Sequence, residues 1–417
     1  MTAAHLHLDA GAGMSWPALD GLARVHGDAF FVFDEAELRA NVSALRAAMA
    51  AAAPDVELAY SIKANYTPAV CRLAHSLGMM VEVSSPLELW LAERLGIPGP
   101  RTVYDGPGKS ADSVRDALLA GTLVNLESER DVEWALATAR EHPQRRFGVG
   151  LRCSVATRQA PVSRLGFETE GSTLEAVAAR LAGAGNLSVI GLHGHVPDGS
   201  ADGLRARTAE LVRVAVRLFP DGPDVLDVGG SLRGRVPIGH DTAGDAEPTF
   251  DDYAAAIAEG LRPGADRWTR RPRIIVEPGA AVVSSAFCLY ARVVDVKTIR
   301  GCDFVVVAAS VLDTSPNMRR VDFPVRVISR RLSRGGAAPA AARVCGITPI
   351  NGDFLALELP ARASAGDFVR FDNVGAYSIS MRPAFNFPPH AILQTDGGEV
   401  TVLRARQSCE DVLRGFV

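Results

Sequence analysis

The chain has 417 residues, 47% of them hydrophobic, and a formal net charge of −4 at pH 7. This balance gives no reason to expect nucleic acid or a charged membrane surface as a partner, and the longest apolar runs, such as 304–309, are strand-sized. Residues 1–14 lack the pattern of a signal peptide, and the six cysteines have no CxxC or metal-like spacing. We therefore expect a cytoplasmic protein with reduced thiols.

From about residue 30 to residue 279, short β-branched runs alternate with longer helical patterns. The pattern predicts strands at 56–62, 79–84, 101–104, 122–126, 146–153, 187–193, 224–228 and 273–277. Ser172 and Thr249 have the sequence context of helix N-caps, each with an acidic residue three positions later. Eight strands with helices between them predict a parallel (β/α)8 barrel, and an open doubly wound sheet is the alternative.

After Gly279 the chain turns to β-rich runs separated by glycine, proline and charged turns. Strands are expected at 281–296, 304–311, 325–328, 343–345, 368–371, 391–394 and 399–403, with no long helix before the last dozen residues. This pattern predicts a second, mostly antiparallel β domain. We expect residues 30–280 to form the barrel, and residues 1–29 and 281–417 to form the β domain that completes the active site.

Lys63 follows the first predicted barrel strand, in the stretch Ala59-Tyr-Ser-Ile-Lys-Ala-Asn65. A lysine at the end of a buried strand is costly unless a partner or a covalent bond takes up its charge. Desolvation lowers the basicity of the amine and makes it a nucleophile that forms Schiff bases with carbonyl compounds. The alternative is a lysine that simply reaches the surface.

Barrel enzymes build their sites at the carboxyl ends of the strands, so the other strand ends are expected to meet Lys63. These ends carry Glu82, Arg152, His193-Gly-His195, Asp227-Val-Gly-Gly230 and Glu277-Pro-Gly279. Adjacent glycines allow backbone N–H groups to approach an anion closely. A His-x-His pair suggests zinc, but no third or fourth ligand has matching spacing, so we expect no metal.

Taken in order, and with Asn125-Leu-Glu-Ser128, Ser163-Arg-Leu-Gly166 and Gly375-Ala-Tyr377, these motifs resemble the fold-type III pyridoxal-phosphate enzymes. The resemblance is to the diaminopimelate, ornithine and arginine decarboxylase branch. It implies that Lys63 binds pyridoxal 5'-phosphate covalently, that His195 stacks on the ring and that Glu277 pairs with the pyridine nitrogen. Further implied cofactor contacts are Arg152 at the phenolic oxygen and, at the phosphate, Gly229, Gly230, Gly279, Tyr377 and Ser200.

The resemblance also predicts the reaction and the assembly. Alanine racemases of this fold place an arginine at the position of Glu277, whereas a carboxylate keeps the pyridine nitrogen protonated. A pyridinium is the stronger electron sink when CO2 leaves, so we expect a decarboxylase. A homodimer with shared active sites is implied, without nucleic-acid or membrane partners.

The sequence departs from the family pattern at four places. Ala280 stands where the family reads arginine, Ser231 replaces the last residue of a glycine triplet, and the loop before Ser200 is longer than usual. The fourth departure concerns a loop that reaches the partner's site, where the family supplies a cysteine acid and a carboxylate for the substrate's distal ammonium. Pro349 and Ile350 occupy those two positions, and neither side chain donates a proton or pairs with an ammonium.

A free diamino acid would then lose a charge-assisted pair worth roughly 1.5–3 kcal/mol. We therefore expect an atypical amino-acid substrate that is acylated, carboxylated or carrier-bound, as in siderophore or secondary-metabolite biosynthesis. Candidates for binding an anionic substrate tail are Arg319, Arg320 and Arg382. The proton donor after CO2 loss is left open between Cys345, Tyr377, Lys63 and water. The alternatives are a racemase or epimerase, another lyase of this fold, and a catalytically impaired pyridoxal-phosphate-binding protein.

Overall fold

The computed structural model describes residues 8–9, 13–52, 55–156, 163–234, 248–314, 323–330, 341–396 and 399–416. The chain divides into two compact units. The first, which we call the barrel unit, contains Ala40–Arg235 and Glu247–Val282, and the second, the β unit, contains Met1–Arg39 and Val283–Val417. Among the described residues, none of the helices combines the length and the hydropathy that crossing a bilayer requires.

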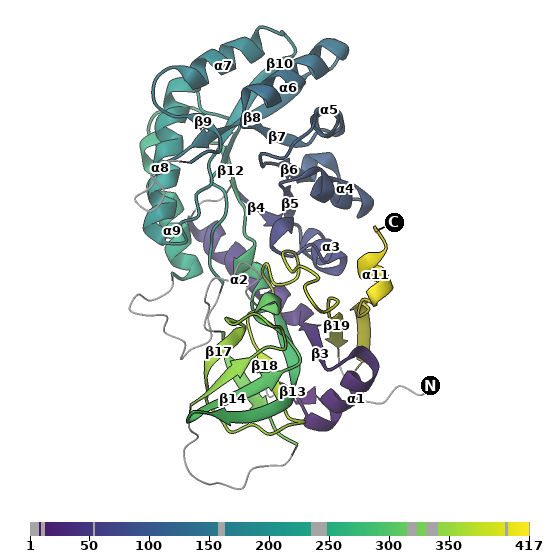
Figure 1. The fold of residues 1–417 in the computed structure, drawn as a ribbon. Coiled ribbons are helices and arrows are strands. Elements are labelled where there is room, and N and C mark those ends of the chain that lie inside the picture. The colour runs from purple at the N-terminus through teal and green to yellow at the C-terminus, as the bar shows by residue number, and fades with distance from the viewer. Residues whose placement is uncertain are drawn as a thin grey trace. The chain divides into compact units, whose positions relative to one another are not determined.

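The barrel unit is built on eight parallel strands that close into a ring (Figure 1). In order around the ring they are β4 (Val56–Ser61), β5 (Met80–Val83), β6 (Thr102–Tyr104), β7 (Leu123–Leu126), β8 (Phe147–Ser154), β10 (Leu187–His193), β11 (Val225–Asp227) and β12 (Arg273–Val276). β12 pairs back to β4, which excludes an open sheet, and a two-residue strand β9 (Phe167–Glu168) pairs with β8. The predicted barrel and its eight strands are confirmed.

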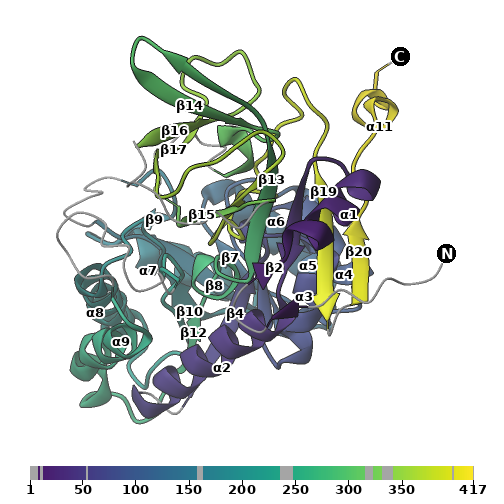
Figure 2. The same cartoon turned by 90° about the horizontal axis from the view of Figure 1, so that it is seen from below.

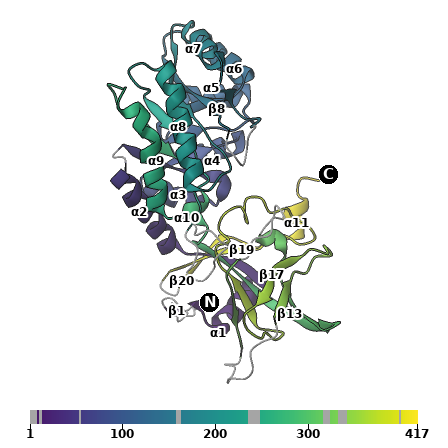
Figure 3. The same cartoon turned by 90° about the vertical axis from the view of Figure 1, so that its left-hand side faces the viewer.

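Apolar side chains fill the ring because alternate residues of each strand point inward. One buried cluster within it consists of Ala59, Met80, Val103, Leu123, Val225 and Ile275. The helices of this unit are α2 (Glu35–Ala52, which begins in the β unit), α3 (Pro68–Ser76), α4 (Pro86–Arg94), α5 (Ala111–Ala120), α6 (Glu129–Glu141), α7 (Thr173–Ala182), α8 (Ala201–Leu218) and α9 (Phe250–Ala265). Figure 3 shows α8 and α9 side by side along one flank. Short 3-10 turns are η1 (Ile62–Ala64) and η2 (Gly99–Arg101).

One of the two predicted helix caps is confirmed and the other is wrong. The Thr249 side chain accepts from the Asp252 backbone N–H at the start of α9, and Asp252 caps in return. Ser172 precedes α7, but its side chain makes no capping hydrogen bond. Its backbone, at φ −118° and ψ 14°, lacks the extended conformation that aims an N-cap hydroxyl at the first turn.

The β unit is mostly antiparallel, as predicted. Its strands are β1 (Leu8–Asp9), β2 (Gly13–Met14), β3 (Ala29–Phe33), β13 (Phe287–Ile299), β14 (Cys302–Val307), β15 (Val325–Ile328), β16 (Ala342–Cys345), β17 (Phe354–Leu359), β18 (Phe368–Phe371), β19 (Ala391–Asp396) and β20 (Glu399–Arg404). Its helices are α1 (Trp16–His26), η3 (Val311–Asp313) and α11 (Cys409–Leu413). Figure 2 shows β19 beside β20, and only the β14–β16 and β3–β19 pairs in the described residues of this unit are parallel.

Several elements of this unit differ from the prediction. The strand expected at 281–296 begins later, because α10 (Ala280–Val283) comes first and β13 starts at Phe287. The strands β1, β2, β3 and β17 were not expected.

The strand β3, which precedes α2, explains where the chain divides into its two units. β3 pairs with β13 and β19, so residues 30–39 fall in the β unit rather than in the barrel unit. Buried Phe30 and Val32 pack there with Tyr290, Phe368 and Leu393. The predicted domain boundaries at residues 30 and 280 stay a prediction.

Candidate active site

Lys63 lies in η1, directly after β4, and its ammonium donates to Oε2 of Glu82 at the end of β5. Glu82 is completely buried. Burial by itself would lower the pKa of Lys63, but the carboxylates of Glu82 and Glu277 outweigh it and raise the pKa above its usual range. The expectation that desolvation weakens this amine was therefore wrong for the cofactor-free site, because a buried counter-ion accompanies the lysine.

Glu277 follows β12 and is buried beside two imidazoles. Its Oε1 lies 3.7 Å from Nε2 of His193, and its Oε2 lies 3.6 Å from Nδ1 of His195. Burial would raise the pKa of Glu277, yet His193, His195 and Asp105 hold it well below its usual range. Burial also lowers the pKa of each histidine to about 4, so both imidazoles are neutral near pH 7 while Glu277 is ionised.

Two further acids belong to this site, and the sequence motifs assigned them no role. Asp105 follows β6 and accepts from Nδ2 of Asn125 at 2.7 Å, while Asp227 ends β11 and accepts from the Gly229 backbone N–H at 3.0 Å. Burial and the charge of Glu277 raise the pKa of both aspartates well above the usual range. Only the position of each acid at a strand end could have revealed it from the sequence.

The tertiary structure also changes the argument about metals. Ligand atoms of Asp105, His193, Asp227 and Glu277 lie within 4.8 Å of one another. These residues come from four different strand ends, so spacing in the sequence does not reveal the cluster. The absence of a metal stays a prediction.

The glycines predicted to hold a phosphate line a place where a side chain would not fit. A Cβ on Gly229 would come 2.6 Å from the Gly194 carbonyl oxygen, one on Gly230 would collide with the Glu277 carbonyl, and one on Gly279 would lie 2.9 Å from Cβ of Ala64. Gly229 also has a φ of 68°, which glycine adopts readily. These positions form a cradle of bare backbone at the mouth of the barrel.

The hydrogen bonds of this cradle differ in part from the prediction. The N–H of Gly229 donates to Asp227, and that of Gly230 donates to Nδ1 of His195 at 3.1 Å. Ser200 is the N-cap of α8, where its hydroxyl donates to Oδ1 of Asp198 at 2.7 Å and accepts from the Gly203 N–H. Both amides and the Ser200 hydroxyl thus have partners within the chain, and their contact with a phosphate stays a prediction.

Arg152 lies in β8 and is buried, with Nη1 3.5 Å from Oε2 of Glu127. Burial raises the pKa of Glu127, while Lys109 and Arg152 oppose that rise. Arg152 therefore places a fixed positive charge in the barrel unit, as its predicted role beside a phenolate oxygen requires. That role stays a prediction.

The other predicted site residues belong to the β unit. Cys345 is the last residue of β16, and its thiol donates to the Arg343 carbonyl oxygen at 3.8 Å. Burial raises the pKa of this thiol. Tyr377 has a φ of 66° and a side chain that is partly exposed. The roles predicted for these two residues stay predictions.

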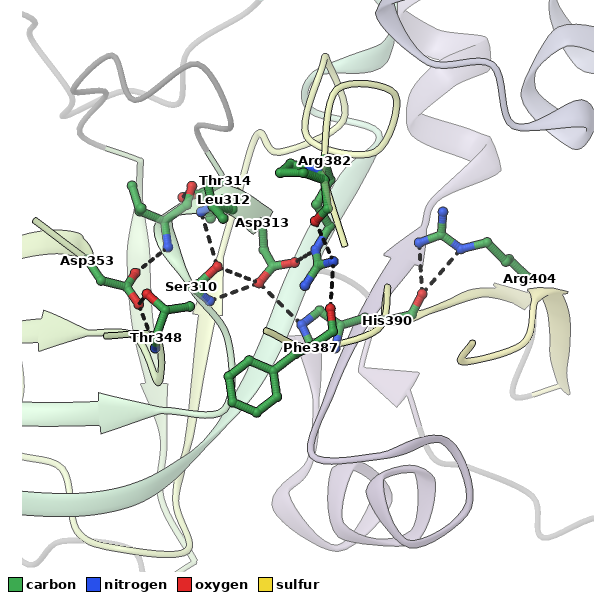
Figure 4. A network of polar contacts seen from close by, with 12 residues as sticks. Ser310, Leu312, Asp313, Thr314, Thr348, Asp353, Arg382, Phe387, His390 and Arg404 are labelled. Atoms are coloured by element: carbon green, nitrogen blue, oxygen red, sulfur yellow. Dashed lines mark hydrogen bonds and ion pairs between the residues drawn. The ribbon is translucent and has the colours of Figure 1, made fainter. Parts of the chain in front are cut away.

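Arg382 has a different partner from the anionic substrate tail that we expected (Figure 4). Its Nε donates to Oδ1 of Asp313, and its Nη1 donates to the carbonyl oxygens of Pro383 and Phe387. The Arg382 side chain is only 3% exposed. Asp313 already neutralises the guanidinium, and the contact of Arg382 with an anionic substrate tail stays a prediction. Arg319 and Arg320 lie outside the described residues.

The residues of the barrel mouth suit pyridoxal phosphate. Oε1 of the buried, ionised Glu277 has no hydrogen-bond partner in the described part of the chain, which suits a protonated ring nitrogen. Lys63 supplies an amine for the aldehyde. The fold and these side chains together define a barrel enzyme that holds an aldehyde cofactor on a lysine.

Comparisons with known proteins place the chain within that class. Residues 36–284 match the family model described as "Pyridoxal-dependent decarboxylase, pyridoxal binding domain". The chain is 31% identical over 415 residues to a diaminopimelate decarboxylase of Actinosynnema pretiosum, which covers 95% of this chain and 90% of that protein. It is 25% identical over 413 residues to the diaminopimelate decarboxylase of Aquifex aeolicus, covering 95% and 93%. The chain belongs to the pyridoxal-dependent decarboxylase family.

A solved structure shows the same fold over nearly the whole chain. The diaminopimelate decarboxylase of M. jannaschii in complex with L-lysine matches with a TM-score of 0.86 at 20% identity, covering 96% of this chain and 94% of that one. The expected cofactor, pyridoxal 5'-phosphate, and the expected reaction class are confirmed by the family. The protein is a pyridoxal-phosphate-dependent carboxy-lyase that acts on an amino acid.

Proposed function

We propose that this carboxy-lyase acts on an amino acid whose side chain ends in an acylated, carboxylated or carrier-bound group rather than in a free ammonium. Siderophore or secondary-metabolite biosynthesis is the setting that needs such a decarboxylase. The observation that carries the proposal is the pair Pro349 and Ile350 in the loop from Gly346 to Asp353. Neither side chain ionises, so this loop offers an ammonium no counter-charge there.

Hydrogen bonds hold this loop in one conformation (Figure 4). Oδ1 of Asp353 accepts from the Val311 N–H at 2.6 Å, and its Oδ2 accepts from the Thr348 N–H at 3.0 Å. The Gly346 N–H donates to the Asp353 carbonyl oxygen at 2.9 Å, directly after β16. Cys345, held in β16, cannot take the place of Pro349 without breaking these contacts, so a shifted loop is a poor source of the missing acid.

The barrel residues supply the chemistry that is common to the family. When bound, pyridoxal phosphate supplies the electron sink for the pair left at Cα as CO2 departs. Lys63 holds the cofactor, and Glu82 receives the proton that the Lys63 ammonium must lose before its amine can react. The raised pKa of buried Glu82 suits it to accept that proton. Glu277 would keep a proton on the ring nitrogen, and His195 would lie against the ring.

The decisive experiment measures CO2 release from purified, cofactor-loaded enzyme. Free lysine, ornithine, arginine and diaminopimelate are compared with analogues whose distal amine is acylated or carries a carboxylate. We expect the modified substrates to react with kcat/KM values higher by about one to two orders of magnitude, the worth of one charge-assisted pair. Brisk CO2 release from any free diamino acid would contradict the proposal.

A single substitution can restore the carboxylate that the loop from Gly346 to Asp353 lacks at position 350. Ile350→Glu introduces a carboxylate at the position discussed above, and we expect it to raise kcat/KM for free diamino acids about ten- to a hundredfold. Asn351→Asp is the matched control, because it adds the same charge one residue further along. Equal gains in both variants would show that net charge, rather than the position of the carboxylate, determines the preference.

Diaminopimelate decarboxylation is the second candidate function, because the relatives named above carry that name. It predicts that diaminopimelate is the best substrate of the unmodified chain. The same measurement therefore separates the two proposals.

We further propose that the enzyme works as a homodimer in which the loop from Gly346 to Asp353 reaches the partner's site. Light scattering of the loaded enzyme should then give twice the mass of one chain. Full activity at a concentration where only single chains are present would refute this. For an anionic substrate tail, Arg319 and Arg320 remain our candidates, and replacing either by alanine should raise KM more than it lowers kcat.

A further inference from the structure

Ser231 occupies a backbone conformation that a side chain rarely adopts. Its φ is 68°, in the left-handed region, directly after Gly229 and Gly230. A residue with a Cβ is strained there, and glycine would relieve the strain. Such strain persists only where surrounding contacts hold it, and it concentrates at functional sites. The contacts of the Ser231 side chain therefore need to be identified.

The Ser231 hydroxyl lies between a carbonyl group and an imidazole. Its Oγ donates to the Val196 carbonyl oxygen at 2.7 Å and lies 3.3 Å from Nε2 of His195. Because the single hydroxyl proton is used on Val196, Oγ can only accept from His195. This contact requires a proton on Nε2 of the imidazole.

The contact of the other ring nitrogen, Nδ1, independently indicates the same position for the imidazole proton. The Gly230 backbone N–H donates to Nδ1 of His195 at 3.1 Å, so Nδ1 carries a lone pair and no proton. His195 is thus neutral, with its one proton on Nε2. Two contacts, one on each side of the ring, determine both the tautomer and the orientation of the imidazole.

A buried arginine braces the same two segments. Arg207, in α8, is fully buried, and it donates to the Val196 carbonyl oxygen at 3.2 Å and to the Gly230 carbonyl oxygen at 2.9 Å. The carbonyl that receives the Ser231 hydroxyl and the glycine that donates to His195 are therefore fixed together. The hydroxyl contact is part of a rigid network.

We propose that Ser231 is a positioning residue whose hydroxyl holds His195 as the neutral, Nε2-protonated tautomer in a fixed plane at the cofactor site. The placement of His195 at that site rests on the function proposed above. The benefit concerns Glu277, whose Oε2 lies 3.6 Å from Nδ1 of His195. A proton on Nδ1 would let His195 donate to this carboxylate, whereas the Nε2-protonated tautomer leaves the charge of Glu277 for the ring nitrogen.

The charged groups around His195 act on its protonation in both directions. Burial disfavours the imidazolium most strongly, Glu277 favours it, and Lys63 and Arg207 disfavour it. His193, also neutral, lies on the other side of Glu277. The Gly230 N–H favours the neutral ring, because it occupies the lone pair of Nδ1, and the Ser231 hydroxyl, which accepts from Nε2, determines which nitrogen carries the proton.

The test compares Ser231→Ala with Ser231→Gly. Both variants remove the hydroxyl, but only the glycine variant also removes the backbone strain. Ser188→Ala, in β10 and away from His195, is the matched control. Long-range proton–nitrogen correlation spectra of cofactor-free protein labelled at its nine histidines report the tautomer and its titration, and His195→Gln assigns the signal.

We expect the unaltered protein and the Ser188 control to show a single Nε2-protonated tautomer for His195. Both Ser231 variants should show a mixture of tautomers for His195, and both should release bound pyridoxal phosphate faster on dilution. A single, unshifted tautomer in both variants would overturn the proposal. A change in the glycine variant alone would also overturn it, because the altered backbone rather than the missing hydroxyl would then be responsible. These spectra require no substrate, so they stand whichever amino acid is decarboxylated.

Discussion

The ion pair between Asp313 and Arg382 offers a sharp test of what the β unit does with its buried charges (Figure 4). The Asp313 side chain is 1% exposed, and its Oδ2 also accepts from the Ser310 N–H at 2.8 Å. Nε2 of His390 lies 3.2 Å from the same oxygen. Burial would raise the pKa of Asp313, but His390 and Arg382 hold it well below its usual range. The carboxylate therefore stays charged although it is buried.

Asp313→Asn keeps the shape of the side chain and removes its charge. The Arg382 guanidinium is then buried without a counter-ion, which costs about 3–5 kcal/mol. Arg382→Met should cost less, about 1.5–3 kcal/mol, because His390 still faces Asp313. In Asp313→Leu/Arg382→Met both charges are gone, and the loss should fall short of the sum of the single losses by about 1–3 kcal/mol.

Urea unfolding of the full chain, followed by hydrogen exchange in residues 346–353 and 377–390, measures these losses within the β unit. Asp112→Asn, in an exposed pair with Arg115, is the control and should leave the exchange in both segments unchanged. The pKa of Asp313 is lower in the folded than in the unfolded chain. The ionised carboxylate therefore contributes fully to stability above the unfolded pKa of about 3.9, and this contribution is lost as the pH falls below that value. If Arg382→Met raises KM while exchange in both segments is unchanged, Arg382 binds substrate and the buried-pair argument fails.

Three further predictions concern the barrel unit. Lys63→Ala should abolish the absorbance of bound pyridoxal phosphate and lower CO2 release at least about 10³-fold. Lys63→Arg, which keeps the charge, should lose the absorbance and the activity to the same extent. A variant that keeps both the absorbance and the activity would contradict the assignment of Lys63. His193 and His195, with folded pKa values of about 4, take up protons only in the unfolded chain between pH 6.5 and pH 4. Stability of the cofactor-free protein should therefore fall with decreasing pH across that window, by up to about 2.7 kcal/mol per pH unit, and His193→Gln should halve the slope; an unchanged slope would show that His193 is protonated in the folded protein. Thr249→Ala should destabilise the start of α9 by about 1 kcal/mol, as measured by hydrogen exchange. Ser172→Ala should leave exchange in α7 unchanged, because of these two residues only Thr249 makes a capping hydrogen bond. Equal effects of the two substitutions would refute the capping argument.

The regular parts of the fold were predictable because each depends on local patterns. Every barrel strand appears within two residues of its predicted bounds, since short β-branched runs between helical periods leave little choice. The errors lie where distant partners decide. β3 joins the β unit through its pairing with β13, and α10 replaces the start of a predicted strand. The Ser172 cap failed because backbone dihedrals, rather than residue type, aim the hydroxyl.

The site shows the same division. Lys63, His195 and Glu277 could be named from motifs, because each stands directly after an apolar strand and strand ends share one mouth. Glu82 as the partner of Lys63, and Asp105 beside Glu277, could not be named, because their distances depend on how neighbouring strands are staggered around the ring. The ion pair of Arg382 with Asp313 could not be named either, since an exposed and a buried arginine look alike in sequence.

The sequence by itself determined the barrel, because periodicity is a local property, and its resemblance to the family named Lys63 and Glu277 as candidates for binding the cofactor. Only the tertiary structure decided the charge states: a protonated Lys63 beside Glu82, a neutral His195 between Ser231 and Gly230, and an ionised Asp313 beside Arg382. The physical reason is that protonation depends on burial and on charges a few ångströms away, and folding brings those neighbours together from distant parts of the chain.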